Sequence, residues 1–339
     1  MKLSHTTVTV RLGSPFRISR STTEHATVLE IAIEAQGVVG YGEAAPQAHY
    51  KESIESAAAF LDDAESLLGD DPFALDAIGR RLASVPGEMA AKSGIDAALH
   101  DLCGKLAGVS AWRLLGHDRL GPPTSWTVWL GDPDDMAARA AEAAPRFRRL
   151  KLKLGGRDGL DVDRVRAVRE ATDRPLMVDV NEYWTLEEAL DSVPKLAELD
   201  VQYVEQPLPA GDEDGAALKD ASPLPIYLDE DCHTLSDVAS CARRAHGVNL
   251  KLTKSGGIRE ACRMAHAARA LGLGVMLGCM IETGLGIAAG CQVAPLCDFV
   301  DLDGNLLLAE DPWSGVDFAE GIQQPSESAG LGVTRRGSA

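Results

Sequence analysis

The chain opens with alternating apolar and polar residues and then changes to a helical pattern. From Lys2 to about Gly42 a period of two, as in TTVTVRL and ATVLEIAIEAQGVVGYGE, predicts three short antiparallel strands with a turn at Gly37. Apolar residues spaced by three and four positions then predict helices at about 51–69, 73–83 and 88–106, the last ending at Gly108. These elements predict an α+β unit at the start of the chain.

The sequence pattern changes after GPPTSW, where short apolar runs alternate with helical segments rich in Ala, Arg and Glu. The runs recur at a nearly constant interval, at 125–129, 149–154, 175–180, 201–205, 225–229, 247–252, 273–277 and 298–302. Repeats of this kind predict a (β/α)₈ barrel of the α/β class with its helices outside. The pattern stops after Asp311, and the remaining residues are predicted to return to the first unit.

Composition and charge narrow the choice of partners. Lys and Arg number 33 against 51 Asp and Glu, a net charge of −18, which argues against nucleic acid and against anionic membranes. The start MKLSHTTVTVRL has no signal-peptide core and no apolar run has membrane-spanning length, so we expect a cytoplasmic protein. Seven cysteines without a CxxC pair indicate neither a disulfide framework nor a thiolate zinc site. Cys232, Cys279 and Cys291 are predicted to be small buried apolar side chains.

Two lysines stand at alternate positions of the second predicted barrel strand, RLKLKL. On a solvated sheet this alternation would place the lysines outward. In a barrel the helices cover the outer face, so the leucines must face outward and Lys151 and Lys153 inward. Two neighbouring ammonium groups repel each other and lose solvent, so at least one is expected to have a lowered pKa and to act as a base.

Carboxylates end the next three predicted strands: Asp179 in VDVN, Glu205 in VEQP and Asp229 in LDED. All three therefore reach the C-terminal face of the barrel, where barrel active sites lie. Each acid alone has the alternative of a helix cap or a loop charge. Together they would repel one another without a cation, and an oxygen-only ligand set suits Mg²⁺, with Mn²⁺ as a substitute.

Lys251 ends the sixth predicted strand, in VNLKLTKSGG, and lies opposite Lys151 and Lys153 across an eight-stranded ring. A carbon held between the two sides could lose a proton to one lysine and regain one from the other on its opposite face. The lost proton would lie next to a carboxylate, where Mg²⁺ would stabilise the resulting charge. Lys254, three residues later, is predicted to lie in a Gly-rich loop and to contact substrate rather than act as the base.

These motifs, in this order, resemble the enolase superfamily in its muconate-lactonising branch. VDVNEYW, EQPLPAGDEDGAAL, PLPIYLDEDCHT, VNLKLTKSGG, MLGCMIETGLGI and DLDG are similar to those of dipeptide epimerases of the L-Ala-D/L-Glu type, and the likeness extends over essentially the whole chain. The resemblance implies a modified TIM barrel of the (β/α)₇β type at 116–310, with an N-terminal α+β capping domain at 1–115 completed by about 311–339.

The resemblance also implies roles for single residues. Lys153 and Lys251 would be the acid/base catalysts, with Lys151 adjusting Lys153. The residues that would hold Mg²⁺ are Asp179, Glu205 and Asp229. Asp301 and Asp303 match the family's Asp-x-Asp, whose second acid receives the free ammonium of a dipeptide. A loop cap is the alternative for this pair.

The capping domain would close over the substrate with loops near 14–25 and 44–52. Arg20 matches an arginine that pairs with the side-chain carboxylate of the substrate in Ala-Glu enzymes, with a solvated loop charge as the alternative. Thr22, Thr23 and His25 depart from the pattern expected of those enzymes, which weakens glutamate specificity and leaves the dipeptide class intact. His49 and Tyr50 have no assigned role.

The resemblance therefore implies an isomerase that epimerises the C-terminal residue of a dipeptide, such as L-Ala-L-Glu, in the recycling of cell-wall peptides. Related alternatives are o-succinylbenzoate synthesis, muconate cycloisomerisation and N-acylamino-acid racemisation, which use the same lysines and metal. DLDG favours a substrate with a free amine. A silent barrel that serves as a binding protein would be expected to have lost a lysine or a metal ligand. Family members often assemble, so a homo-oligomer is a further expectation.

Overall fold

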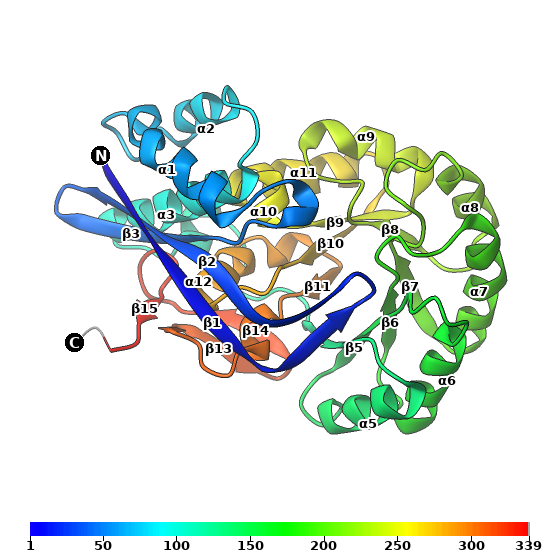
Figure 1. The fold of residues 1–339 in the computed structure, drawn as a ribbon. Coiled ribbons are helices and arrows are strands. Elements are labelled where there is room, and N and C mark those ends of the chain that lie inside the picture. Colours follow the sequence, from blue (N-terminus) through cyan, green and yellow to red (C-terminus); the bar gives the residue numbers. More distant parts are fainter. Residues whose placement is uncertain (338–339) are drawn as a thin grey trace.

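The computed structural model describes residues 1–337 and begins with the three-stranded antiparallel sheet that the alternation predicts (Figure 1). Its strands are β1 (Lys2–Ile18), β2 (Ser21–Ala35) and β3 (Val38–Ala44). β1 and β2 are longer than predicted, because the expected loop at 14–25 is instead the end of one hairpin, with its tip at Ser19 and Arg20. The turn at Gly37 is confirmed, and its φ of 75° suits a residue without a Cβ atom.

The three predicted helices are confirmed as α1 (Ile54–Leu68), α2 (Leu75–Ala83) and α3 (Met89–Ala107). Their apolar faces pack with β2 and β3 in one buried cluster. Gly42 on β3 lies so close to Gly94 on α3 that a Cβ atom at Gly42 would collide with the helix backbone. The small residues therefore set how closely the helix can approach the sheet.

All eight predicted barrel strands are present, and they are joined in one parallel sheet in chain order. They are β4 (Ser125–Val128), β5 (Arg149–Lys153), β6 (Leu176–Asp179), β7 (Val201–Glu205), β8 (Ile226–Leu228), β9 (Gly247–Leu250), β10 (Gly274–Gly278) and β11 (Phe299–Asp301). The helices between them are α5 (Pro133–Ala143), α6 (Asp161–Ala171), α7 (Leu186–Glu198), α8 (Gly215–Ala221), α9 (Leu235–Arg244), α10 (Leu252–Ser255), α11 (Ile258–Ala270) and α12 (Gly284–Cys291). A helix follows each of the first seven strands, which confirms the (β/α)₇β form of the modified TIM barrel.

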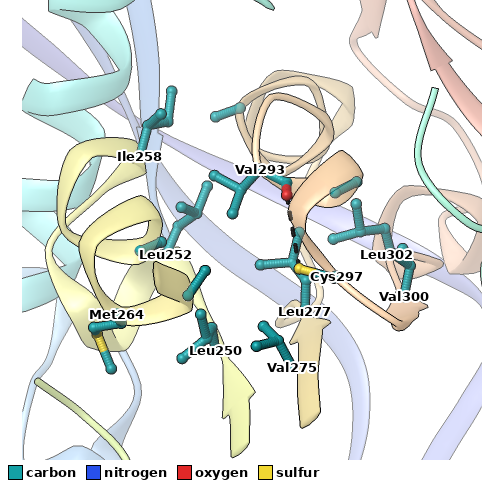
Figure 2. Packing of buried hydrophobic residues seen from close by; sticks show 14 of the residues in the cluster. Leu250, Leu252, Ile258, Met264, Val275, Leu277, Val293, Cys297, Val300 and Leu302 are labelled. Atoms are coloured by element: carbon teal, nitrogen blue, oxygen red, sulfur yellow. Dashed lines mark hydrogen bonds between the residues drawn. The ribbon is translucent and has the colours of Figure 1, made fainter. Parts of the chain in front are cut away.

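The last strand closes the barrel against the first. Thr124 forms a parallel bridge with Val300, and the Leu302 amide donates a hydrogen bond of 2.8 Å to Thr124 Oγ1. Figure 2 shows the outer side of this region, where side chains of β9 and β10 such as Leu250 and Leu277 pack beneath α11 and α12. Burial of this apolar surface supplies the main stabilisation of the barrel wall.

A second, smaller cluster fills the inside of the barrel. Met177, Tyr203, Tyr227 and Met276 are all buried, and Phe299 packs against them. Because side chains alternate along a strand, Met177, Tyr203 and Tyr227 lie on the same inward face as Asp179, Glu205 and Asp229, two residues further on. The cluster therefore forms an apolar floor below these three carboxylates and excludes water from that side.

The C-terminal segment contacts both the first sheet and the barrel. Trp313 Nε1 donates a hydrogen bond of 2.8 Å to Glu30 on β2, and the Leu331 amide donates one of 2.8 Å to Asp101 on α3. The hairpin of β13 (Val316–Ala319) and β14 (Ile322–Pro325) places Phe318 against Phe147, with ring centroids 4.9 Å apart. Domain boundaries at 115 and 310 stay a prediction. Residues 338 and 339 of the predicted C-terminal return lie outside the described residues.

A buried pair of glutamates joins the first domain to the barrel. The Thr283 amide at the start of α12 donates a hydrogen bond of 2.9 Å to Glu43 at the end of β3, and the Thr283 hydroxyl donates another. Burial and the neighbouring Glu282 raise the pKa of Glu43 to about 8, and burial raises the pKa of Glu282 to about 7. Both carboxyls therefore hold protons in the folded chain that the unfolded chain releases near pH 4.5.

Because these pKa values are raised on folding, their contribution to the free energy of unfolding falls as pH rises from about 4.5 to 8. We expect Glu43→Gln, which keeps an acceptor for Thr283, to lose less thermal stability than the wild type between pH 6 and pH 9. Between these pH values the Tm of the wild type should fall by at least about 2 °C more than the Tm of Glu43→Gln, which corresponds to roughly 1 kcal/mol. Calorimetry with the exposed Glu170→Gln as control measures it, and parallel Tm curves for Glu43→Gln and wild type would contradict this account.

Candidate active site

β5 places the two lysines as the barrel argument predicts. Leu150, Leu152 and Leu154 are fully buried in the cluster between the sheet and the outer helices. Lys151 and Lys153 point the other way and line a cavity inside the mouth of the barrel. The inward orientation of the lysines is therefore confirmed, and the solvated-sheet alternative is excluded.

Lys151 is surrounded by acids. Its Nζ lies 2.7 Å from Glu205 Oε2, 2.8 Å from Asp301 Oδ2 and 3.1 Å from Asp179 Oδ2. Burial lowers its pKa, but the three carboxylates outweigh burial and raise the pKa well above its usual value. Lys151 thus does not follow the expectation of a lowered pKa, because the nearest charges are acids from three other strands and not the neighbouring lysine.

The three predicted metal ligands come together at the ends of β6, β7 and β8. Asp179 and Glu205 are register partners, and all three side chains are buried. Lys153 Nζ lies 2.6 Å from Asp179 Oδ2, and Lys251 Nζ lies 2.7 Å from Asp229 Oδ2. Each predicted acid/base lysine therefore forms an ion pair with one predicted metal ligand.

These carboxylates carry opposing pKa shifts. Burial and Asp179 raise the pKa of Glu205 to about 7. Burial also disfavours charge on Asp179 and Asp229, but their lysine neighbours lower the pKa of both. Glu205 Oε2 is buried and accepts no hydrogen bond from the described residues, although Lys151 Nζ lies 2.7 Å away. Three clustered carboxylates, one of them with such an oxygen, fit a hard divalent cation. When bound, the cation would balance part of the negative charge that the lysines balance in its absence.

The structure corrects the prediction for Lys254. It lies on the short helix α10 and not in a loop, and only 1% of its surface is exposed. Its ammonium donates hydrogen bonds of 2.5 Å to Asp229 Oδ1, 2.6 Å to the Asp229 carbonyl and 3.1 Å to the Asn249 carbonyl. Its three donors are all engaged in these bonds, and Lys254 does not line the cavity, so the structure does not support the predicted substrate contact.

Asp301 and Asp303 lie on the other side of the cavity, at the end of β11. Asp301 accepts hydrogen bonds from Lys151 at 2.8 Å and from Ser125 Oγ at 2.5 Å. Asp303 Oδ2 accepts one of 2.7 Å from the Thr127 amide on the neighbouring side of the ring. Burial and Asp301 raise the pKa of Asp303 to about 7. Among residues 1–337, Asp303 thus forms no ion pair, whereas Asp301 pairs with Lys151.

One cavity of about 640 Å³ joins these groups to the first domain. Its charged lining residues are Arg20, Lys151, Lys153, Lys251, Asp301 and Asp303. The hairpin tip and the segment Gln47–Tyr50 form its roof, as the resemblance implied. Cys232 and Cys291 are buried as predicted, whereas Cys279 is partly exposed and lines the cavity, because it follows β10 at the barrel mouth.

Arg20 reaches the cavity, but two acids that the sequence reading overlooked already hold it. Its guanidinium lies 2.9 Å from Glu230 Oε1 and 3.4 Å from Glu182 Oε2. His49 Nε2 lies 3.0 Å from the same Glu182 oxygen. These two acids stand in DVNE and LDED, one to three residues after predicted ligands, and that position at two strand ends is the signal that could have found them.

Comparison with known families agrees with this architecture. The model of the mandelate racemase / muconate lactonizing enzyme N-terminal domain matches residues 2–116, and the enolase C-terminal domain-like model matches residues 135–338. The chain therefore belongs to the mandelate racemase and muconate lactonizing enzyme family of the enolase superfamily. Within residues 1–337 no helix combines the length and apolarity that crossing a bilayer requires.

Named relatives are similar along nearly the whole chain. An L-Ala-D/L-Glu epimerase of Bacteroides thetaiotaomicron is 37% identical over 99% of this chain and 88% of that protein. A hydrophobic dipeptide epimerase of Roseobacter litoralis is 39% identical over 98% of both chains. A crystal structure of a dipeptide epimerase from Enterococcus faecalis, complexed with Mg and L-Leu-L-Tyr, superimposes with a TM-score of 0.94 at 30% identity, over 98% of this chain and 99% of that one.

Proposed function

We propose that this chain is a dipeptide epimerase, which inverts the α-carbon of the C-terminal residue of a dipeptide. The observation that carries the proposal is the placement of Lys153 and Lys251 at the ends of the second and sixth strands of the ring, with both lining one cavity. Similarity to named dipeptide epimerases over nearly the full chain supports it. Incubation with an L,L-dipeptide followed by chromatographic separation of diastereomers tests it, and a product free of the L,D form would oppose it.

In the proposed reaction one lysine acts as base and the other as acid. Neutral Lys153 takes the α-proton from one face of the carbon, and the Lys251 ammonium gives a proton to the other face. The reverse reaction exchanges the two roles, so each lysine serves one stereoisomer. Lys151, held by three carboxylates, keeps a fixed positive charge beside Lys153.

Asp179, Glu205 and Asp229 are the proposed ligands of Mg²⁺, with Mn²⁺ as a substitute. When bound, the ion supplies positive charge beside the substrate carboxylate and so favours loss of the neighbouring proton. Asp303 is proposed to accept the substrate ammonium, and Asp301 to hold Lys151. A cytoplasmic location, a homo-oligomeric state and a role in recycling cell-wall peptides stay predictions from the sequence.

The metal proposal makes a direct prediction for Glu205→Gln. We expect Mg²⁺ affinity, measured by isothermal titration calorimetry, to fall about tenfold or more, because one of three anionic ligands is lost. Removing metal from the wild type with a chelator should lower turnover at least about a hundredfold, and added Mg²⁺ should restore it. Glu213→Gln, in the loop before α8, is the control. Unchanged Mg²⁺ affinity in Glu205→Gln would contradict the assignment.

A further inference from the structure

The acids around Arg20 have no part in the proposed proton transfer. Two carboxylates, Glu182 and Glu230, surround one guanidinium, and His49 contacts the first of them. Burial and the neighbouring Asp229 raise the pKa of Glu230 to about 7, so near neutral pH the two acids together bring at least the one negative charge that balances Arg20. Burial disfavours the charge of Arg20, but Glu230 outweighs burial and raises the pKa of Arg20.

Glu182 is fixed in place by its surroundings. Its Oε1 accepts a hydrogen bond of 2.9 Å from the Ala210 amide, and its own amide donates one of 2.8 Å to the Gln206 carbonyl. Glu182 and Asn181 both have left-handed backbone, with φ of 73° and 50°. Non-glycine residues keep this conformation only where the structure around them enforces it, so the backbone is held here, and the bond from Ala210 holds the carboxylate beside Arg20.

Glu230 depends on Arg20 more strongly. Its side chain is 1% exposed, and Arg20 is the cation within ion-pair distance of it in the described part of the chain. Asn181 Nδ2 donates a long hydrogen bond of 3.4 Å to its Oε1, and Oε2 has no donor among residues 1–337. If a substrate carboxylate drew Arg20 away, Glu230 would lose the cation that the structure places beside it, and its buried carboxylate would have to take up a proton.

Position in the ring decides which part of a dipeptide faces Arg20, an argument that rests on the proposed function. With the substrate ammonium at Asp303 and the α-carbon between Lys153 and Lys251, the terminal carboxylate points toward β6, β7 and β8. Glu182 follows β6 and Glu230 follows β8, so Arg20 lies above that side. Asp303 and the strand ends then take up the ammonium and the terminal carboxylate, so the side chain of the C-terminal residue is the remaining part of the substrate that can point up to Arg20 at the hairpin tip.

We propose that this pocket selects dipeptides whose C-terminal residue is uncharged and apolar, and discriminates against glutamate. A glutamate side chain would bring a third carboxylate to a guanidinium that two carboxylates already hold. A lysine side chain would meet Arg20 first, since Arg20 lines the cavity and the two acids lie behind it. Apolar side chains also line the cavity here, with Phe16 and Ile18 on the hairpin and Ile54 at the start of α1, and the polar ones beside them, such as Thr23 and Gln47, carry no charge. Arg20 thus serves to balance two internal acids and not to bind a substrate carboxylate.

The test compares kcat/KM for L-Ala-L-Leu, L-Ala-L-Glu and L-Ala-L-Lys, followed as epimerisation by proton NMR with Mg²⁺. We expect the leucine dipeptide to exceed both others at least about tenfold. Glu182→Gln removes one acid from Arg20 and should raise the Glu/Leu ratio of kcat/KM at least about fivefold, mainly through KM. Glu198→Gln, an exposed glutamate at the end of α7, should leave that ratio unchanged.

A wild-type preference for L-Ala-L-Glu or L-Ala-L-Lys, or an unchanged ratio in Glu182→Gln, would overturn this inference and leave the proposed function standing. Epimerisation of none of the three dipeptides would overturn the proposed function and this inference with it.

Discussion

Lys251→Ala is expected to lower epimerisation about a thousandfold or more while it preserves α-proton exchange of one diastereomer. Loss of a positioned acid/base group costs on the order of a hundredfold to ten-thousandfold. Lys153 remains on β5 and can still remove and return the proton on its own side. Lys153→Ala should show the mirror result, with exchange of the other diastereomer only.

Proton NMR in D₂O with each pure diastereomer measures both effects in one experiment. Lys195→Ala, an exposed lysine on α7 that pairs with Asp191, is the control and should match the wild type. Mg²⁺ titration of each variant distinguishes a missing base from a damaged metal site, since Asp229 still has Lys254 as its partner in Lys251→Ala. Retained epimerisation in either variant, or loss of both exchanges in both, would contradict the opposed-lysine account.

Asp303→Asn is expected to lower kcat/KM for a dipeptide about tenfold to a hundredfold and to leave Mg²⁺ affinity within about twofold. The lost charge-assisted hydrogen bond to the substrate ammonium is worth roughly 1.5–3 kcal/mol. Asparagine keeps an acceptor for the Thr127 amide, so the loop should stay in place. Equal loss of turnover and Mg²⁺ binding would contradict the role proposed for Asp303.

The pH profile provides a second readout of the same residue. Because the pKa of Asp303 is raised to about 7, its carboxylate form, which binds the ammonium, is lost as pH falls below that value. Wild-type kcat/KM should therefore rise between pH 6 and pH 8, and Asp303→Asn should show a weaker rise. Asp317→Asn on the exposed side of β13 is the matched control.

The fold was predictable from the sequence because the barrel imposes a strict pattern on it. Each strand carries a short buried run, and the regular spacing of these runs predicts all eight strands. The structure adds that β11 closes the ring beside β4. Alternation in RLKLKL also sufficed to place Lys151 and Lys153 inside, once helices were known to cover the other face. These features depend on local sequence and on the symmetry of the ring.

The remaining features depend on contacts between distant segments. The pKa of Lys151 follows from Asp301, which is 150 residues away in sequence and adjacent in space. The GG that follows Lys254 predicts a loop, yet Lys254 lies in a buried helix and pairs with Asp229 at the end of the neighbouring strand. The resemblance implies a substrate contact for Arg20, and only the folded chain brings Arg20 to Glu182 and Glu230.

The most direct test of the central claim is the isotope content of the first product formed in D₂O with Mg²⁺ and L-Ala-L-Leu. Two opposed lysines predict that the new L,D diastereomer carries solvent deuterium at the α-carbon from the earliest time points, because the incoming proton comes from the lysine that did not remove the old one. An L,D product that retains the substrate's own α-proton would contradict this account. So would α-exchange confined to N-acylamino acids or a succinylated cyclohexadiene.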